Sequence, residues 1–230
     1  MAAPDLPVLI VGDVHGDIRR LFKALKPHPP DRWRTVFVGD LVDYGAFGVG
    51  VLRYARDRPN TEVLLGNHEV AMLWALRDPT RIGWWIAIGG QEHDLAELRR
   101  DEVLQRWMRE RPALLDLADG TVVQHCGNDA YLELGRDVAA INATAAEQLR
   151  TGGERLLWDL FSSPNVFEAQ PERLDRYLES IDARRVAFGH KPERGRKPLT
   201  FHGGRALNFE GAVAPLPDQA TAGRQSLHGR

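Results

Sequence analysis

The stretch VLIVGDVHGD, residues 8–17, begins as an apolar run rich in β-branched residues and ends with two aspartates and a histidine set around two glycines. Two later stretches repeat the pattern, TVFVGDLVDYG at 35–45 and EVLLGNHE at 62–69. In each one the apolar run stops at a glycine followed by Asp or Asn, and Asp13, Asp40 and Asn67 stand 27 residues apart both times. Short runs of this kind are typical of buried strands, so we expect strands at 7–12, 34–39 and 62–65.

The segments between these runs have the spacing of helices. DIRRLFKALK carries apolar residues at 18, 21, 22 and 25 and is followed by a proline, and GVLRYARDRP and HEVAMLWALRD behave in the same way. A chain that alternates strand and helix at this pace is typical of an α/β sheet with parallel strands.

The remainder of the chain predicts more helices and two hairpins. We expect helix at 92–110, 137–150, 154–161 and 171–181, and a strand at 184–190. The turn ADG at 118–120 and the pair Gly203-Gly204 predict hairpins. We expect one domain over 1–211 and a flexible tail over 212–230, because residues beyond Gly211 show no periodicity.

Composition excludes some classes of function. A formal net charge of −2 without a basic stripe argues against non-specific nucleic-acid binding. The single cysteine, Cys126, fits a reducing compartment, and no segment has the roughly 18 apolar residues of a membrane span. The N-terminal apolar run ends in Gly-Asp and reads as a first strand rather than a signal peptide. We therefore expect a cytoplasmic protein without membrane contact.

The polar residues that follow the strands predict a metal site. Ligands of open α/β sheets bind beyond the carboxyl ends of the strands. VVQHCG and VAFGH add a histidine each to that edge, which gives six donors: Asp13, His15, Asp40, Asn67, His125 and His190. Any one of them alone could be a turn residue or a core histidine. Together they suit Mn²⁺, Fe or Zn²⁺, and a carboxylate can bridge two such ions.

The motifs GDVHGD, GDLVDYG and GNHE, a later strand-end histidine and a final GH resemble those of the calcineurin-like metallophosphoesterases. Within that family the chain is most similar to the phosphoprotein-phosphatase branch, including bacterial serine/threonine phosphatases and diadenosine-tetraphosphatase-like members. The motifs occur in the right order over most of residues 8–190. The resemblance implies a metallophosphoesterase sandwich of two mixed β-sheets flanked by helices, and a metallophosphoesterase domain over 1–211.

The resemblance also implies residue roles. Two divalent ions, manganese first and iron or zinc as alternatives, would activate water for attack on phosphorus. Asp13 and His15 would hold the first ion, Asp40 would bridge both, and the second would be held by Asn67, His125 and His190. His68 would protonate the leaving oxygen, and Asp43 would orient His68. For Glu69 we expect only the role of an acidic residue in the first turn of a helix.

Three positions depart from the family pattern, because arginines that usually bind the substrate phosphate are replaced by Tyr44, Leu65 and Leu160. In one interpretation another cation substitutes, with Lys191 as the first candidate and Arg194 and Arg196 as weaker ones. In the other, the phosphorus carries less charge, as in a diester or an anhydride, and Tyr44 donates a hydrogen bond or stacks on a ring.

The expected function is hydrolysis of phosphomonoesters, phosphoproteins among them. A phosphodiesterase or a dinucleoside polyphosphate hydrolase on the same centre is the alternative, so the expected partner is a phosphoprotein or a nucleotide. A third hypothesis, of another class, is a degenerate metal-binding sensor or scaffold. The presence of both His68 and Asp43 argues against it, because a protein without catalytic activity would have little need for this pair.

Of the six tryptophans, we expect Trp84 or Trp85 to approach the cleft.

Overall fold

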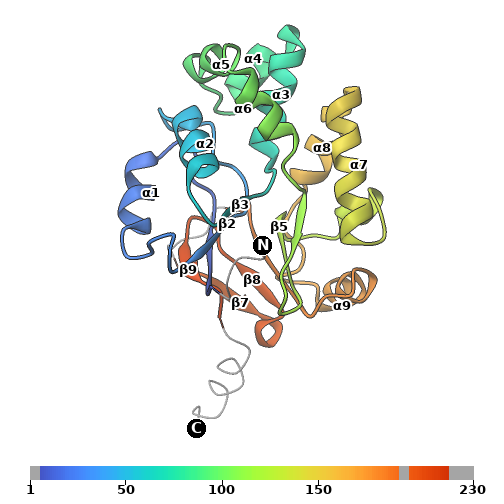
Figure 1. The fold of residues 1–230 in the computed structure, drawn as a ribbon. Coiled ribbons are helices and arrows are strands. Elements are labelled where there is room, and N and C mark those ends of the chain that lie inside the picture. The colour runs from blue at the N-terminus through green and yellow to red at the C-terminus, as the bar shows by residue number, and fades with distance from the viewer. Residues whose placement is uncertain (1–5, 192–196, 218–230) are drawn as a thin grey trace.

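The computed structural model describes residues 6–191 and 197–217, which fold into two mixed β-sheets (Figure 1). The first sheet has the order β3-β2-β1-β9, with β1 (Val8–Val11), β2 (Arg34–Phe37) and β3 (Thr61–Val63) parallel and β9 (Val213–Pro215) antiparallel to β1. The second has the order β4-β5-β6-β8-β7. Its strands are β4 (Leu114–Asp116), β5 (Thr121–Cys126), β6 (Arg185–Gly189), β7 (Leu199–Phe201) and β8 (Ala206–Asn208).

Helices cover the outer faces of the sheets (Figure 1). They are α1 (Ile18–Leu25), α2 (Gly48–Asp57), α3 (Asn67–Arg77), α4 (Ile82–Ala87), α5 (Glu92–Leu98), α6 (Glu102–Arg109), α7 (Val138–Thr151), α8 (Glu154–Phe161) and α9 (Pro171–Ser180). No helix in the described ranges is long and apolar enough to span a membrane.

Alternation along the strands divides the core into two clusters. In β1, Ile10 belongs to a small cluster with Val36, Val123 and Leu207, which come from strands of both sheets. Its neighbours Leu9 and Val11 belong to the larger cluster, which also contains helical residues. Successive side chains of a strand point to opposite faces, so both faces of the sheet are buried. The expected α/β sandwich of two mixed sheets is therefore confirmed.

The parallel β1-β2-β3 arrangement and both predicted hairpins are present, as β4–β5 and as β7–β8. The expected tail over 212–230 begins too early, because Val213–Pro215 form β9 and pair with β1. A proline there is compatible with a strand only because β9 lies at the sheet edge. The remainder of that tail, 218–230, lies outside the described residues, as do Arg194 and Arg196.

Candidate metal centre

The loops after β1 and β2 are joined by backbone hydrogen bonds. The N–H groups of Val14 and His15 both donate to the carbonyl oxygen of Asp40, at 3.0 and 2.9 Å, and Gly16 donates to Leu41 at 2.8 Å. These bonds place Asp13, His15 and Asp40 at the same edge of the sheet. The side chains of both aspartates are buried.

Asp13, His15 and Asp40 form one group of candidate ligands. Nε2 of His15 lies 3.9 Å from a carboxylate oxygen of Asp13 and 3.9 Å from one of Asp40. Nδ1 of His15 lies 3.0 Å from the carbonyl oxygen of Val42. A carbonyl can only accept, so Nδ1 carries the proton and Nε2 keeps its lone pair for a cation.

Asn67, His125 and His190 form a second group. Nε2 of His125 lies 2.8 Å from Oδ1 of Asn67 and 3.1 Å from Nδ1 of His190, and the last two atoms are 3.1 Å apart. Ligand atoms at about 2.1 Å from one ion and at right angles lie about 3.0 Å apart, which matches this spacing. Nδ1 of His125 donates to the Val38 carbonyl at 3.1 Å, so its Nε2 also keeps a lone pair.

Asp40 lies between the two groups. Its Oδ2 is 3.9 Å from Nε2 of His15 and 3.4 Å from Nε2 of His125. Two sets of ligand atoms that could each hold an ion share it: His15, Asp40 and His68 in one, and Asp40, His125 and His190 in the other. The arrangement therefore offers one carboxylate to two neighbouring cation positions.

The charges at this edge fit bound cations. Burial and the neighbouring carboxylates of Asp40 and Glu210 raise the pKa of Asp13 well above its ordinary value. Burial and Asp40 raise the pKa of Glu69 to about 7. Among the residues that the structure describes, no lysine or arginine forms an ion pair with Asp13 or Asp40. Carboxylate, amide and imidazole donors together suit divalent transition metals, so the residues present fit such ions.

His68 and Asp43 are paired beside this centre. Nδ1 of His68 lies 2.7 Å from Oδ2 of Asp43, and the same oxygen accepts a hydrogen bond from Nε1 of the buried Trp85 at 3.1 Å. Burial disfavours the charged imidazole, but the carboxylates of Asp40 and Asp43 outweigh it and raise the pKa of His68 to about 9. His68 can therefore hold a proton at neutral pH.

The backbone is strained at the same place. Positive φ angles occur at five site residues: His15, Asp40, Asp43, Tyr44 and His190. Side chains other than glycine disfavour this left-handed region, and such residues persist only where surrounding contacts enforce them. These residues lie in the loops after β1, β2 and β6, which carry four of the six candidate ligands.

Glu69 has a larger structural role than the sequence indicates. It occupies the first turn of α3 as expected, but its carboxylate also accepts hydrogen bonds from the backbone N–H groups of Asp40 and Leu41, both at 2.7 Å, and of Gly66 at 2.9 Å. It therefore holds the loop after β2 against the start of α3. A carboxylate three residues after a glycine cap is the sequence signal that could have revealed this capping contact.

The positions of the missing arginines are occupied by residues that cannot bind an anion by charge. Leu65 and Leu160 are buried, whereas Tyr44 is 62% exposed and its ring contacts those of His15 and His68 at centroid distances of 4.8 and 5.2 Å. Nζ of Lys191 lies 3.3 Å from a carboxylate oxygen of Glu168.

Of the two tryptophans expected near the cleft, Trp85 contacts Asp43. Trp84 packs against Trp158, and the ring of Trp158 is 6.2 Å from that of His68.

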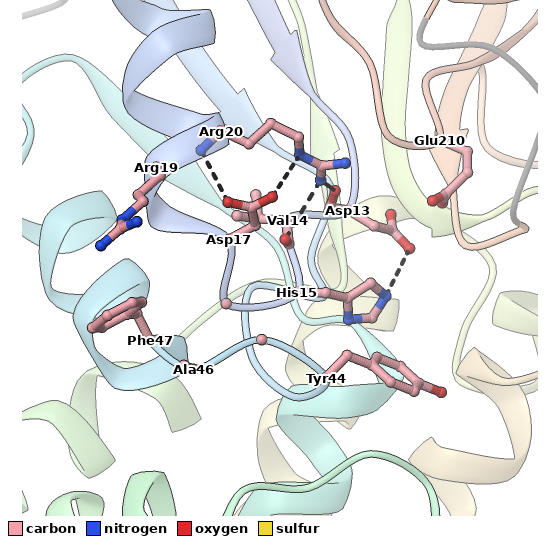
Figure 2. A pocket seen from close by; sticks show the side chains of 12 residues that line it. Asp13, Val14, His15, Asp17, Arg19, Arg20, Tyr44, Ala46, Phe47 and Glu210 are labelled. Atoms are coloured by element: carbon pink, nitrogen blue, oxygen red, sulfur yellow. Dashed lines mark hydrogen bonds and ion pairs between the residues drawn. The ribbon is translucent and has the colours of Figure 1, made fainter.

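A hollow of about 630 Å³ opens beside Asp13 and His15. Figure 2 shows Glu210 facing Asp13 across one side of it, from the segment between β8 and β9. Arg19 and Arg20 also line the hollow. These two arginines and Glu210 belong to no recognisable motif, so the sequence did not predict them as site residues.

A family model described as calcineurin-like phosphoesterase matches residues 6–194. Among solved structures, a cold-active protein-tyrosine phosphatase of a psychrophilic Shewanella species superposes with a TM-score of 0.66 at 18% identity, over 90% of this chain and 71% of that chain. A serine/threonine phosphatase of Saccharomyces cerevisiae gives 0.65 at 17% identity, over 92% and 69%. A putative diadenosine tetraphosphatase gives 0.56 at 19% identity, over 92% and 86%. No curated protein matches the sequence.

Proposed function

Because the chain belongs to the calcineurin-like phosphoesterase family and is a metal-dependent phosphoric ester hydrolase, we propose that it hydrolyses phosphomonoesters, phosphoproteins among them, at a centre of two divalent ions. The observation that carries the proposal is the position of Asp40, whose Oδ2 lies 3.9 Å from the ring of His15 and 3.4 Å from that of His125. A carboxylate shared in this way is what a two-metal centre requires.

Each side chain then has a role. Asp13, His15 and Asp40 would hold one ion, and Asp40 with Asn67, His125 and His190 would hold the other. When bound, two such ions supply Lewis-acid chemistry, which polarises phosphoryl oxygens and lowers the pKa of a water molecule. Manganese is the metal we propose, because a mixed set of carboxylate, amide and imidazole suits it. The buried Cys126 is the single cysteine, which supports a reducing, cytoplasmic setting.

His68 acts as the general acid. Its pKa of about 9 keeps the imidazole protonated at neutral pH, and Asp43 fixes the ring through the 2.7 Å contact with Nδ1. The proton of His68 passes to the oxygen of the departing alcohol, which would otherwise leave as a poorly stabilised alkoxide.

A second candidate function is hydrolysis of a diester or a phosphoric anhydride on the same centre. The buried Leu65 and Leu160 favour it, because a dianionic phosphate is best bound by bidentate guanidinium groups. The two negative charges of a phosphomonoester would need a cation other than these missing arginines. From the sequence we propose Lys191, whose side chain would have to leave its contact with Glu168 to bind the phosphate.

The first experiment compares p-nitrophenyl phosphate with bis-p-nitrophenyl phosphate on one preparation with Mn²⁺ added. A higher kcat/KM for the monoester supports the phosphomonoesterase. A higher value for the diester supports the alternative. Absence of turnover on both, with two ions bound per chain, would overturn the general phosphomonoesterase and leave an enzyme selective for another phosphorylated substrate or a metal-binding sensor.

A further inference from the structure

The hollow beside the metal centre has two ends. Asp13, His15 and Tyr44 line the end at the centre, and Arg19 and Phe47 lie together toward the other end (Figure 2). Its volume of about 630 Å³ is in the range of sites for small molecules. A phosphorus atom placed at Asp13 and His15 would leave the rest of the substrate free to extend toward Arg19 and Phe47.

The two arginines of the hollow differ in what they contact. Arg20 donates to the carbonyl oxygen of Asp13 at 2.8 Å and lies 3.9 Å from a carboxylate oxygen of Asp17, so its guanidinium is used in the wall. Arg19 is exposed, and its side chain forms no hydrogen bond or ion pair within the described part of the chain. An exposed guanidinium that has no protein partner and faces a hollow is suited to an anionic group of a ligand.

The far end also offers an aromatic face. Phe47 directly precedes α2 and lines the hollow, yet its side chain is 49% exposed. A phenyl ring exposed to solvent does not contribute the favourable free energy that burial of its apolar surface would give. A flat ring stacked on it would recover that free energy, and nucleobases stack on aromatic side chains without sequence preference.

We propose that the hollow binds a nucleoside polyphosphate, with its terminal phosphorus at the metal centre, its base on Phe47 and an inner phosphate on Arg19. The proposal rests on the phosphoester hydrolysis assigned to the centre and names its substrate class. A water oxygen bonds to the terminal phosphorus, and the bond from that phosphorus to the bridging oxygen breaks. The bridging oxygen keeps the electron pair, and the proton released by water passes to solvent. The products are inorganic phosphate and the shortened nucleotide.

A phosphorylated tyrosine side chain fits these features less well. Its ring is attached directly to the scissile oxygen and would therefore lie beside Tyr44 and His68. A nucleoside polyphosphate places the ring and the second negative charge far from the scissile bond, which is where Phe47 and Arg19 lie (Figure 2).

The test measures kcat/KM for adenosine triphosphate and for p-nitrophenyl phosphate with Mn²⁺, on the full chain and on four variants. Arg19→Ala and Phe47→Ala each remove one proposed contact. Arg100→Ala and Phe22→Ala are the matched controls, because Arg100 is exposed, Phe22 is 47% exposed and neither lines the hollow. Isothermal titration with a methylene-bridged analogue of the triphosphate measures binding without turnover.

We expect Arg19→Ala and Phe47→Ala each to lower the ratio of kcat/KM for adenosine triphosphate to kcat/KM for p-nitrophenyl phosphate about tenfold, mainly by raising KM for the triphosphate. Each variant should also weaken binding of the analogue to a similar degree. The controls keep the parent ratio. An unchanged ratio in both variants would overturn the nucleotide site, as would a parent enzyme that hydrolyses p-nitrophenyl phosphate but not the triphosphate. Absence of turnover on both substrates would instead count against the proposed function.

Discussion

A β-carbon placed on Gly66 would lie 2.1 Å from Oδ1 of Asp40, far inside van der Waals contact. The φ angle of Gly66 is −96°, which any residue can adopt, so the requirement for glycine does not come from its backbone conformation. It comes from the close approach of Asp40, whose backbone nitrogen would also lie only 2.4 Å from the added β-carbon. We expect Gly66→Ala to push Asp40 aside, to destabilise the fold by about 1–3 kcal/mol and to weaken metal binding.

Gly83→Ala is the control for this prediction. Gly83 lies in α4, and a β-carbon there meets nothing within 4 Å. Alanine should stabilise the helix by about 0.5–1 kcal/mol and leave metal binding unchanged. Thermal unfolding and Mn²⁺ titration of both variants check the pair, and equal metal affinity in Gly66→Ala would show that Asp40 tolerates displacement.

Glu69→Gln should cost about 1–3 kcal/mol, because both carboxylate oxygens of Glu69 accept backbone hydrogen bonds. A glutamine replaces one of these acceptors with an NH₂ group that faces N–H donors. The measurement is chemical denaturation, with the exposed Glu102→Gln in the first turn of α6 as the control. If the two variants unfold at the same denaturant concentration, Glu69 does not hold the loop after β2.

The glycine that precedes Asp13, Asp40 and Asn67 made much of this site predictable, because a strand end followed by an acidic or amide side chain, repeated three times, is typical of ligands gathered at the carboxyl edge of a sheet. Contacts that depend on packing were not predictable in the same way. Glu69 has the pattern of an ordinary first-turn acid, and only the folded loop shows that four backbone N–H groups converge on it. β9 was missed because Val213–Pro215 becomes a strand only through its pairing with β1.

Asp40→Asn should lower metal occupancy at both positions, since Asp40 is the carboxylate that both groups of candidate ligands share. Asp13→Asn is the informative comparison, because Asp13 lies 3.9 Å from His15 and belongs to one group only. Elemental analysis after dialysis against Mn²⁺ should give about two ions per chain for the parent, about one for Asp13→Asn and fewer than one for Asp40→Asn. Two ions retained by Asp40→Asn would refute the bridge.

Asp43→Asn should shift the pH dependence of kcat/KM. Burial lowers the pKa of His68, whereas Asp40 and Asp43 raise it to about 9, so removal of the Asp43 charge lowers it. A general acid is active while protonated, and the alkaline decline in rate should therefore begin at least about one pH unit lower. The exposed Asp31→Asn is the control. A decline at the parent pH would mean that Asp43 does not set the protonation of His68.

His68→Asn should keep both ions and lose most of the turnover. In the proposed assignment the first ion is held by Asp13, His15 and Asp40 and the second by Asp40, Asn67, His125 and His190, whereas Nδ1 of His68 is paired with Asp43. Loss of a general acid costs about 10²–10⁴-fold in rate. The loss should depend on the leaving group, since p-nitrophenolate leaves readily without a proton and phenolate does not. We therefore expect a smaller loss on p-nitrophenyl phosphate than on phenyl phosphate. Equal losses on the two substrates, with two ions still bound, would assign His68 to substrate positioning instead of proton transfer.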